Sequence, residues 1–515
     1  MSGRRVLRIA VRVLMALGLL AVLAVAGAFA AVGRGGAPQT ETRLGADPRL
    51  ERPDTFPIPK VNAPDVVGWP SGRTPTAPAG FSVTRFAGGL DHPRWLYLLP
   101  NGDVLVAESA TLPKAPDSVV TRLLSWLRRG DGSTRQRSAN RITLLRDSDG
   151  DGVADFRGTF LDGLNQPFGM ALLRAAPPYA VGPDAGPGTE VMFYVAGTDG
   201  VWRFPHRLGD TRITAPGEKV LDLPAGGYNN HWTRNLLAAA DGSKLYVTVG
   251  SASNAGEHGL DVERGRAAVL ELDPGGGGAR VYASGLRNPN GLGIEPVTGT
   301  LWAVVNERDA LGDDVSPDYL TRVRDGDFYG WPWSYWGRNV DDRVTPPRPD
   351  LVARALRPDY SLGAHTAPLG LAFSTGPAFP TEYRGGAFVG EHGSWNRGDP
   401  VGYKSSTCRS PTACPAARPA TSSPASSPAP VTARPTGAPW ESSSTGPEAC
   451  WSPTTRATPC GASRRRADTT AARLGGAVPP SRLVRPAGGH RCRARSRSPF
   501  RSSANACSAS ATAPA

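Results

Sequence analysis

Gly89-Leu-Asp-His-Pro-Arg-Trp-Leu96 is the first copy of a unit that the chain repeats, and this repetition decides the fold. Two further plain copies are Gly163-Leu-Asn-Gln-Pro-Phe-Gly-Met170 and Gly285-Leu-Arg-Asn-Pro-Asn-Gly-Leu292, and two weaker ones are Asn230-His-Trp-Thr-Arg-Asn-Leu236 and His365-Thr-Ala-Pro-Leu-Gly-Leu371. The unit recurs about every 55 to 80 residues, and such self-similarity is typical of architectures in which each repeat forms one supersecondary unit.

A turn and a short β-branched and aromatic run follow three of the copies, at residues 100–108, 241–249 and 299–307. Asn101-Gly102 and Asp241-Gly242 supply the positive φ that tight hairpins require. Short strands with hairpin turns at this period predict an all-β fold, a six-bladed β-propeller of which about five blades are recognisable. A β-sandwich and a two-domain α+β protein are the alternatives. The main helical pattern lies at residues 117–129 and predicts a surface helix.

The composition changes abruptly near Lys404. All six cysteines lie beyond it, and residues 405–515 hold fifteen arginines, no lysine and three acidic residues, a net charge of +12 out of +13. The rest of the chain is near neutral, so its charge does not indicate nucleic acid as a partner. A tail this rich in Ser, Pro, Arg and Ala cannot bury enough apolar surface, and we expect residues 405–515 to be disordered. An Arg-rich anchor, a cysteine framework and out-of-frame translation of a GC-rich gene are the other interpretations.

Residues 1–33 are predicted to be a signal peptide or a transmembrane anchor. Four arginines within the first twelve residues precede an uncharged apolar run, 13–33, long enough to span a bilayer. Arginines on that side predict a cytoplasmic start and an exported body on the extracellular or periplasmic side. Ala28-Phe29-Ala30 offers a cleavage site, so a cleaved signal and an anchor in the cytoplasmic membrane both stay open. Residues 34–79, rich in Pro and Gly, are predicted to be a linker before the propeller at 80–404.

His231 is the first candidate for chemistry. Propeller active sites lie where the loops between blades converge on a central channel, so a loop that departs from the repeat is informative. His231 departs from it, because it stands in Tyr228-Asn-Asn-His-Trp232 where other copies have a proline dipeptide. A neutral imidazole there can take a proton from a substrate hydroxyl. A hydrogen-bonded loop histidine without a chemical role is the plainer interpretation.

Two clusters of charged loop residues are further candidates. The guanidinium of Arg287, beside Asn288, suits a ligand carboxylate, and the acidic Gly-containing loop 306–314 offers oxygens to a hard cation such as calcium. In the segment Glu391–Arg397 an aromatic ring stands beside Arg and His, a combination able to stack on a planar anionic cofactor. A solvated charged loop and a loop that merely packs are the respective alternatives.

A third acidic segment, Asp147-Ser-Asp-Gly-Asp-Gly-Val-Ala-Asp155, has the spacing of a calcium-binding loop. Gly158 stands where such a loop has its bidentate Glu, so we expect at most weak calcium binding at the periphery. A solvated acidic turn is the alternative.

The order of these motifs resembles the PQQ-dependent sorbosone dehydrogenase family and, more distantly, soluble quinoprotein glucose dehydrogenase, over about Phe81 to Lys404. The most specific stretches are residues 140–152, 285–291, 328–332 and 386–397. The resemblance implies a six-bladed propeller that holds pyrroloquinoline quinone (PQQ) over its channel with a calcium ion polarising the quinone. It also implies a small sugar as substrate and an external electron acceptor.

The same resemblance assigns roles to residues. His231 is implied to be the general base, which removes the sugar hydroxyl proton while hydride passes to the quinone. The implied cofactor contacts are Arg287, Asn288, Trp395, Asn396 and Arg397. The implied calcium site maps loosely, and mostly through backbone oxygens, onto Asp309, Gly312 and Asp313.

The chain departs from the family where its tail begins. Relatives continue into a last blade that adds basic cofactor contacts, so we expect impaired folding or cofactor binding here. A calcium-dependent propeller lactonase and a non-catalytic extracellular binding propeller are the competing functions. Arg287 and Arg397 favour an anionic cofactor over the lactonase, and His231 argues against a simple scaffold.

Overall fold

The computed structural model describes residues 12, 15, 18–20, 39–54, 72–112, 138–182 and 185–408. Most of the predicted signal or anchor at 1–33, the helix predicted at 117–129 and the tail after Cys408 lie outside the described residues. Within these ranges, no helix combines the length and the apolar character needed to cross a bilayer.

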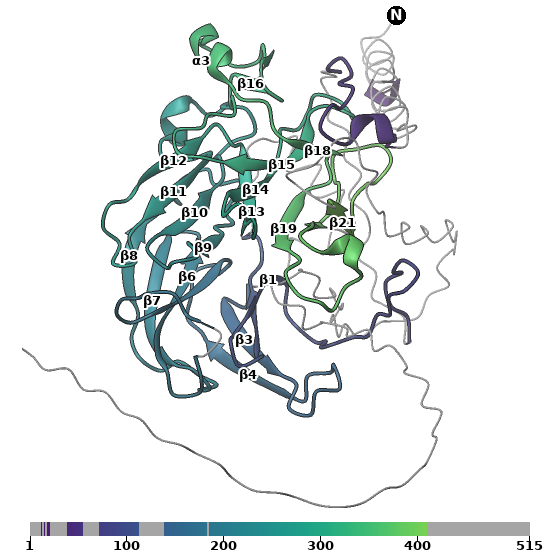
Figure 1. Cartoon of the computed structure of the whole chain (residues 1–515). Coiled ribbons are helices and arrows are strands. Elements are labelled where there is room, and N and C mark those ends of the chain that lie inside the picture. The colour runs from purple at the N-terminus through teal and green to yellow at the C-terminus, as the bar shows by residue number, and fades with distance from the viewer. Residues whose placement is uncertain are drawn as a thin grey trace, which may run out of the picture. The chain divides into compact units, whose positions relative to one another are not determined.

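Five antiparallel sheets follow one another along the chain as the blades of a propeller (Figure 1). Four blades have four strands and the last has three within the described residues. The strands of the first two blades are β1 (Pro93–Leu98), β2 (Val104–Glu108), β3 (Arg141–Arg146), β4 (Phe156–Leu161), β5 (Met170–Arg174), β6 (Glu190–Gly197), β7 (Gly200–Arg207) and β8 (Glu218–Asp222). Those of the third and fourth are β9 (Leu236–Ala238), β10 (Leu245–Val249), β11 (Ala268–Leu272), β12 (Arg280–Ser284), β13 (Asn288–Ile294), β14 (Leu301–Asn306), β15 (Pro317–Val323) and β18 (Tyr360–Ala364), and those of the fifth are β19 (Pro368–Phe373), β20 (Ala387–Glu391) and β21 (Lys404–Cys408).

The repeated sequence unit marks the first strand of every blade. Its five copies end in or lead into β1, β5, β9, β13 and β19. The first strand of one blade contacts that of the next, since β5 contacts β9, β9 contacts β13 and β13 contacts β19. These strands therefore line the centre, and the predicted all-β propeller with five recognisable blades is confirmed.

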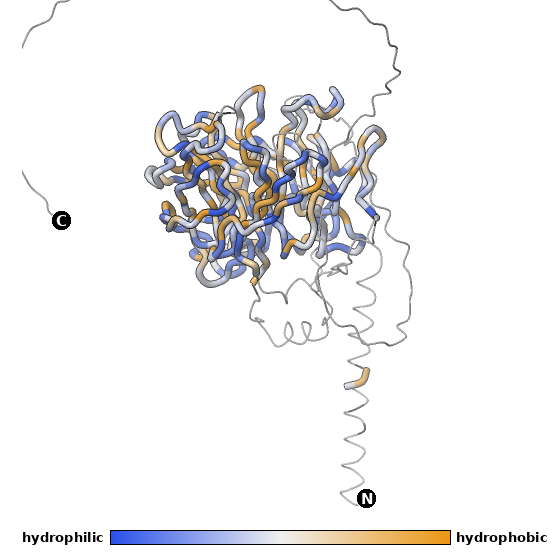
Figure 2. The backbone as a smooth tube through the Cα atoms, turned by 90° about the horizontal axis from the view of Figure 1, so that it is seen from below, coloured by the Kyte–Doolittle hydropathy of each residue, from blue (hydrophilic) through white to orange (hydrophobic). Residues whose placement is uncertain are grey.

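The hydrophobic core lies between successive blades. Side chains of β2, β3 and β6 form one cluster between the first two blades, with Leu105, Ile142 and Phe193 fully buried. Similar clusters fill the next three interfaces, and apolar segments accordingly run through the body of the domain (Figure 2). Both faces of most strands are buried, because a blade packs against a neighbour on each side.

Small elements decorate this frame. The chain between β15 and β18 forms a two-stranded ribbon and the only described α-helix of six or more residues. The elements are β16 (Ser334–Tyr335), β17 (Asn339–Val340), α3 (Pro349–Arg354) and the 3₁₀ turns η1 (Glu41–Arg43), η3 (Leu260–Glu263) and η4 (Thr381–Tyr383).

The two predicted borders of the propeller differ from the structure. Residues 39–54, predicted as linker, pack on the fourth blade, where Gly45 and Ser361 exchange backbone hydrogen bonds of 3.0 and 2.8 Å. At the other border β21 begins at Lys404 and runs to the buried Cys408, so the strand crosses the boundary that composition indicated. In both places backbone pairing with the sheet outweighs a local composition that favours a linker or a tail.

Candidate functional site

The candidate site is formed by the loops that lead into the first strands of the third and fourth blades and by the loop after the second strand of the fourth blade. His231 precedes β9, Arg287 directly precedes β13, and Asp309 follows β14. Repetition of the blade brings these loops to one end of the central strands, so residues far apart in sequence meet there.

His231 is half-buried and held in one tautomer. Its Nδ1 lies 2.8 Å from the carbonyl oxygen of Ser251 and 3.0 Å from the Ser251 hydroxyl oxygen. A carbonyl only accepts, and the Ser251 hydroxyl already donates to the carbonyl of Ser253 at 2.6 Å, so Nδ1 carries the proton. The lone pair of the neutral ring is therefore on Nε2, which accepts a long hydrogen bond of 3.4 Å from the Asn230 amide.

Gly250 brings His231 and Asn288 together. A Cβ at this position would lie 2.5 Å from the Asn288 side-chain oxygen and 2.6 Å from the His231 Cβ. That oxygen of Asn288 is buried and has no hydrogen-bond partner. A buried polar atom without a partner costs free energy, so this one is positioned to contact a ligand beside His231.

Arg287 and Asp309 form a buried ion pair next to this position, with 2.9 Å between nitrogen and carboxylate oxygen. Asn254 holds both members, since its side-chain oxygen accepts from Arg287 at 2.9 Å and from the Asp309 backbone at 2.8 Å. Burial alone would raise the pKa of Asp309, but the charge of Arg287 and then the contact with His365 outweigh it and lower that pKa to about 2. A protonated His231 would act on the pKa of Asp309 in the same direction, with a smaller effect.

Arg397 occupies a separate position on the same acidic loop. Its side chain is fully buried, donates to the carbonyl of Asp313 and lies 3.0 Å from the Asp314 carboxylate. Asn396 is buried beside it, whereas Trp395 is 50% exposed. The structure thus brings Arg287, Asn288 and His231 together and places Arg397 against the far side of the loop, with its charge already paired.

The oxygens of the expected calcium loop are already used by protein donors. The backbone oxygens of all three predicted ligands accept hydrogen bonds: Asp309 from Asn254 (3.0 Å) and Arg343 (3.1 Å), Gly312 from His365 (2.9 Å), and Asp313 from Arg397. Two of these donors are guanidinium groups, whose charge repels a cation. A calcium ion bound through these backbone oxygens would therefore lie beside the guanidinium groups of Arg343 and Arg397.

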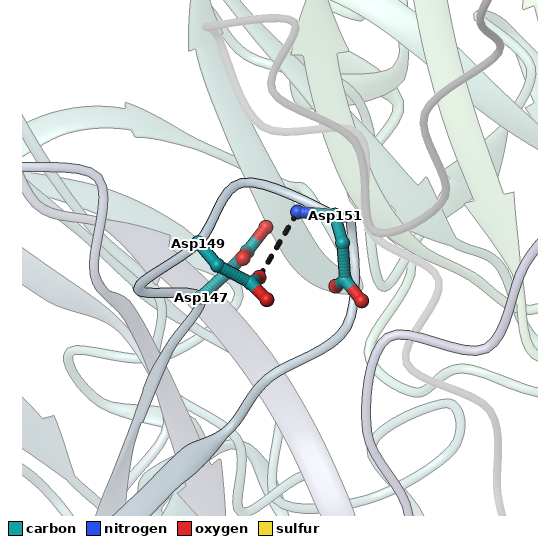
Figure 3. A group of neighbouring side chains, drawn as sticks. All are labelled: Asp147, Asp149 and Asp151. Atoms are coloured by element: carbon teal, nitrogen blue, oxygen red, sulfur yellow. Dashed lines mark hydrogen bonds between the residues drawn. The ribbon is translucent and has the colours of Figure 1, made fainter.

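The peripheral acidic loop forms the cluster that its spacing predicts. The carboxylates of Asp147, Asp149 and Asp151 gather within 4.8 Å of one another at the turn between β3 and β4 (Figure 3). Asp147 accepts backbone hydrogen bonds from Gly150 (2.7 Å) and Gly152 (2.9 Å), and these lower its pKa. The cluster agrees with either the weak calcium site or the solvated turn that the sequence leaves open.

Comparison with known proteins identifies the segment that carries this site. Residues 206–393 match the family model described as Glucose / Sorbosone dehydrogenase. The predicted family resemblance is confirmed. A second family model, described as TrAA12-like, matches residues 352–455 and so reaches beyond the last described residue.

Two curated relatives agree with the glucose/sorbosone dehydrogenase match. One is the aldose sugar dehydrogenase YliI of Escherichia coli K12, 28% identical over 204 residues, which are 36% of this chain and 53% of that protein. The other is an uncharacterised protein of Borreliella burgdorferi, 30% identical over 187 residues, 36% of this chain and 48% of that protein. The chain thus spans about half the length of the curated relatives it matches.

A solved structure shows the same fold as the propeller. It is the iodide structure of a Trichoderma reesei carbohydrate-active enzyme of family AA12, with a TM-score of 0.50 and 19% identity, covering 67% of this chain and 84% of that one. At this identity the likeness concerns the fold alone.

Two residues of the segment that matches the family model were missed as site residues by the sequence reasoning. Asn254 joins Arg287 to Asp309, and His365 lies 3.5 Å from the Asp309 carboxylate. His365 left a signal, because it opens the fifth copy of the repeat where the plain copies have Gly-Leu. Asn254 left none, since a single Asn in the loop after β10 is ordinary loop composition.

Proposed function

We propose that this propeller oxidises a hydroxyl of an aldose or a related sugar or polyol, with hydride transfer to PQQ and His231 as the base. The observation that carries the proposal is the fixed tautomer of His231. With Nδ1–H donating to Ser251, the lone pair of the neutral ring is on Nε2, and a sugar hydroxyl that replaces the long contact with Asn230 could give its proton to this atom. Motif order and the matched family model support the same activity.

Charge in the site supports this role of His231. Asp309 stays ionised at neutral pH, because its pKa is lowered to about 2. Its negative charge attracts the imidazolium that forms when Nε2 takes a proton. Arg287 and Asn254 hold Asp309 in place, so this stabilisation needs no rearrangement during the reaction.

The residues around Asn288 fit a polar planar cofactor. Its buried side-chain oxygen has no hydrogen-bond partner among the described residues, and Gly250 lets this oxygen and His231 approach each other closely. We propose that Asn288 and Arg287 contact PQQ here, whereas cofactor contacts of Trp395, Asn396 and Arg397 stay predictions from the family resemblance. When bound, PQQ supplies the two-electron acceptor for the sugar. The external electron acceptor that would reoxidise it belongs to the same proposal.

No calcium step is derived for the channel, because the backbone oxygens of Asp309, Gly312 and Asp313 already accept hydrogen bonds from protein donors. Export and a membrane-anchored or signal-directed start remain part of the proposal on the basis of the N-terminal arginines and apolar run.

Dye reduction on aldoses after loading with PQQ tests the proposal. His231→Gln should lower kcat by about 10²- to 10⁴-fold, since it removes a general base, while PQQ titration followed by absorbance stays unchanged. His258→Gln replaces an exposed histidine of a neighbouring loop and serves as the matched control. Equal loss of activity in both variants, or lactone hydrolysis without any PQQ binding, would remove the dehydrogenase assignment.

A second experiment tests the expectation that the tail, whose sequence departs from the family pattern, impairs cofactor binding. We expect the chain as given to bind PQQ more weakly than a version to which a sixth blade has been restored. Full activity of the chain as given would contradict the expected impairment while leaving the role of His231 open to the test above.

A further inference from the structure

Two buried arginines lie side by side behind His231. Arg234 is 0% exposed and Arg266 is 6% exposed. Both donate to the same side-chain oxygen of Asn229, Arg234 at 3.2 Å and Arg266 at 2.8 Å. Sharing one acceptor keeps the two guanidinium groups within about 6 Å of each other. Two like charges are thus held close together in a region with little solvent.

The positive charge of this pair is not balanced by the protein. In the described part of the chain no carboxylate forms an ion pair with either arginine. Glu263 is near enough to act on Arg266 through its charge, but its carboxylate accepts hydrogen bonds from the backbone of Ala252 (2.7 Å) and Ser253 (2.9 Å). Two guanidiniums against one carboxylate leave a local charge of one positive unit.

The hydrogen bonds of the pair are also incomplete. The Nε of Arg234 and the Nε of Arg266 are both buried and have no acceptor. Burial, and then repulsion from Arg266, lowers the pKa of Arg234 to about 9. Buried charges are ordinarily paired, and buried donors ordinarily have acceptors, so both features indicate a missing negatively charged acceptor.

We propose that Arg234, Arg266 and Asn229 form a binding site for one small monovalent anion, either a halide or the carboxylate of a sugar acid. The single unbalanced positive charge sets the valence, and the two Nε–H groups supply the donors. The site is distinct from the position of Asn288 and Arg287 but is connected to the base, because Arg234 donates to the backbone carbonyl of His231 at 2.6 Å. An anion there would stabilise the loop that carries His231.

Thermal unfolding at fixed ionic strength tests the site directly. Sodium chloride, bromide, nitrate and gluconate are exchanged in turn for sodium sulfate, a divalent reference. The wild-type Tm should rise saturably with a small monoanion, by about 5 °C at a hundredfold excess over Kd. A rise with halide or nitrate alone identifies an inorganic ion, and a rise with gluconate alone identifies a ligand carboxylate.

Arg266→Gln and Arg264→Gln form the matched pair of variants. Arg264 is two residues away, with 85% of its side chain exposed, so Arg264→Gln should keep the anion response. Arg266→Gln should lose the response and, in sulfate, unfold at a higher temperature than wild type, because the repulsion on Arg234 is gone. Arg266→Lys, which keeps the charge, should retain a weaker response.

A merely structural arginine pair gives the opposite pattern. In that case Arg266→Gln unfolds at a lower temperature than wild type in every salt, with the same salt dependence. That result, or a wild-type Tm that does not depend on the monoanion, overturns the proposal. Neither readout requires PQQ or turnover, so the outcome is independent of the dehydrogenase assignment.

Discussion

Replacing Gly250 by Ala should damage the site more than the fold. The added Cβ would lie 2.5 Å from the Asn288 oxygen and 2.6 Å from the His231 Cβ, whereas ordinary contact begins at 3.4 Å. One or both neighbours must therefore move by about 0.8–0.9 Å. The Asn288 amide can rotate, but the His231 Cβ is fixed to its backbone, so the displacement falls on the base.

A misplacement of about 1 Å at a reacting group costs on the order of 10²-fold in rate, and overpacking costs about 1–3 kcal/mol of stability. We therefore expect Gly250→Ala to fold, to lose about a hundredfold in kcat for aldose oxidation and to unfold at somewhat lower urea. Gly275→Ala is the control, because a Cβ there meets nothing within 4 Å and its backbone is not left-handed. If Gly250→Ala and Gly275→Ala matched wild type in both kcat and stability, the close approach of His231 and Asn288 would be refuted.

Three further predictions concern the side chains of Arg308, Glu391 and Asp147. Arg308→Ala should lower the free energy of unfolding by about 3–5 kcal/mol in urea titration, because it leaves the fully buried Asp341 carboxylate without this guanidinium, 2.9 Å away; a loss below 1 kcal/mol would contradict this. Burial, assisted by a nearby carboxylate, raises the pKa of Glu391 from 4.5 to about 7, so its stabilising effect is complete below pH 4.5 and is lost as pH rises through 7. Relative to Glu391→Gln, wild type should therefore lose about 3 kcal/mol of stability over that window, and parallel pH profiles would disprove it. Asp147→Asn should remove any terbium luminescence of the chain and Asp309→Asn should not; the reverse result would restore calcium to the channel loop.

The blades could be predicted from the sequence because their information is local. Asn101-Gly102 and Asp241-Gly242 turn directly into β2 and towards β10, and strand composition follows each turn. The limits of the domain could not be predicted in the same way. Residues 39–54 have linker composition, yet Gly45 pairs with Ser361, more than 300 positions later, and a window of local sequence carries no trace of that partner.

The site was predictable only in part, for a similar reason. His231 stands out because it departs from the repeat, and Arg287 because it is a charged residue inside a plain copy. The structure pairs Arg287 with Asp309 and brings His231 close to Asn288. The sequence could not show which groups of the site already contact other protein residues, because those partners come from distant parts of the chain. In the sequence, the acidic loop 309–313 has the composition of a cation site. In the structure, its backbone oxygens accept hydrogen bonds from Arg343, His365 and other donors of distant loops.

The segment that precedes the first blade contacts the last described blade through aromatic rings. Phe81, which precedes the first blade, lies 5.5 Å from Phe379 and 5.2 Å from Tyr383, and these two rings pack on Phe388 of β20. Ring contacts slide and separate more readily than paired backbones, which must break several hydrogen bonds at once. Amide hydrogens near this seam should exchange with solvent well before those of β6 or β14, and mechanical pulling on the chain would open the propeller there first.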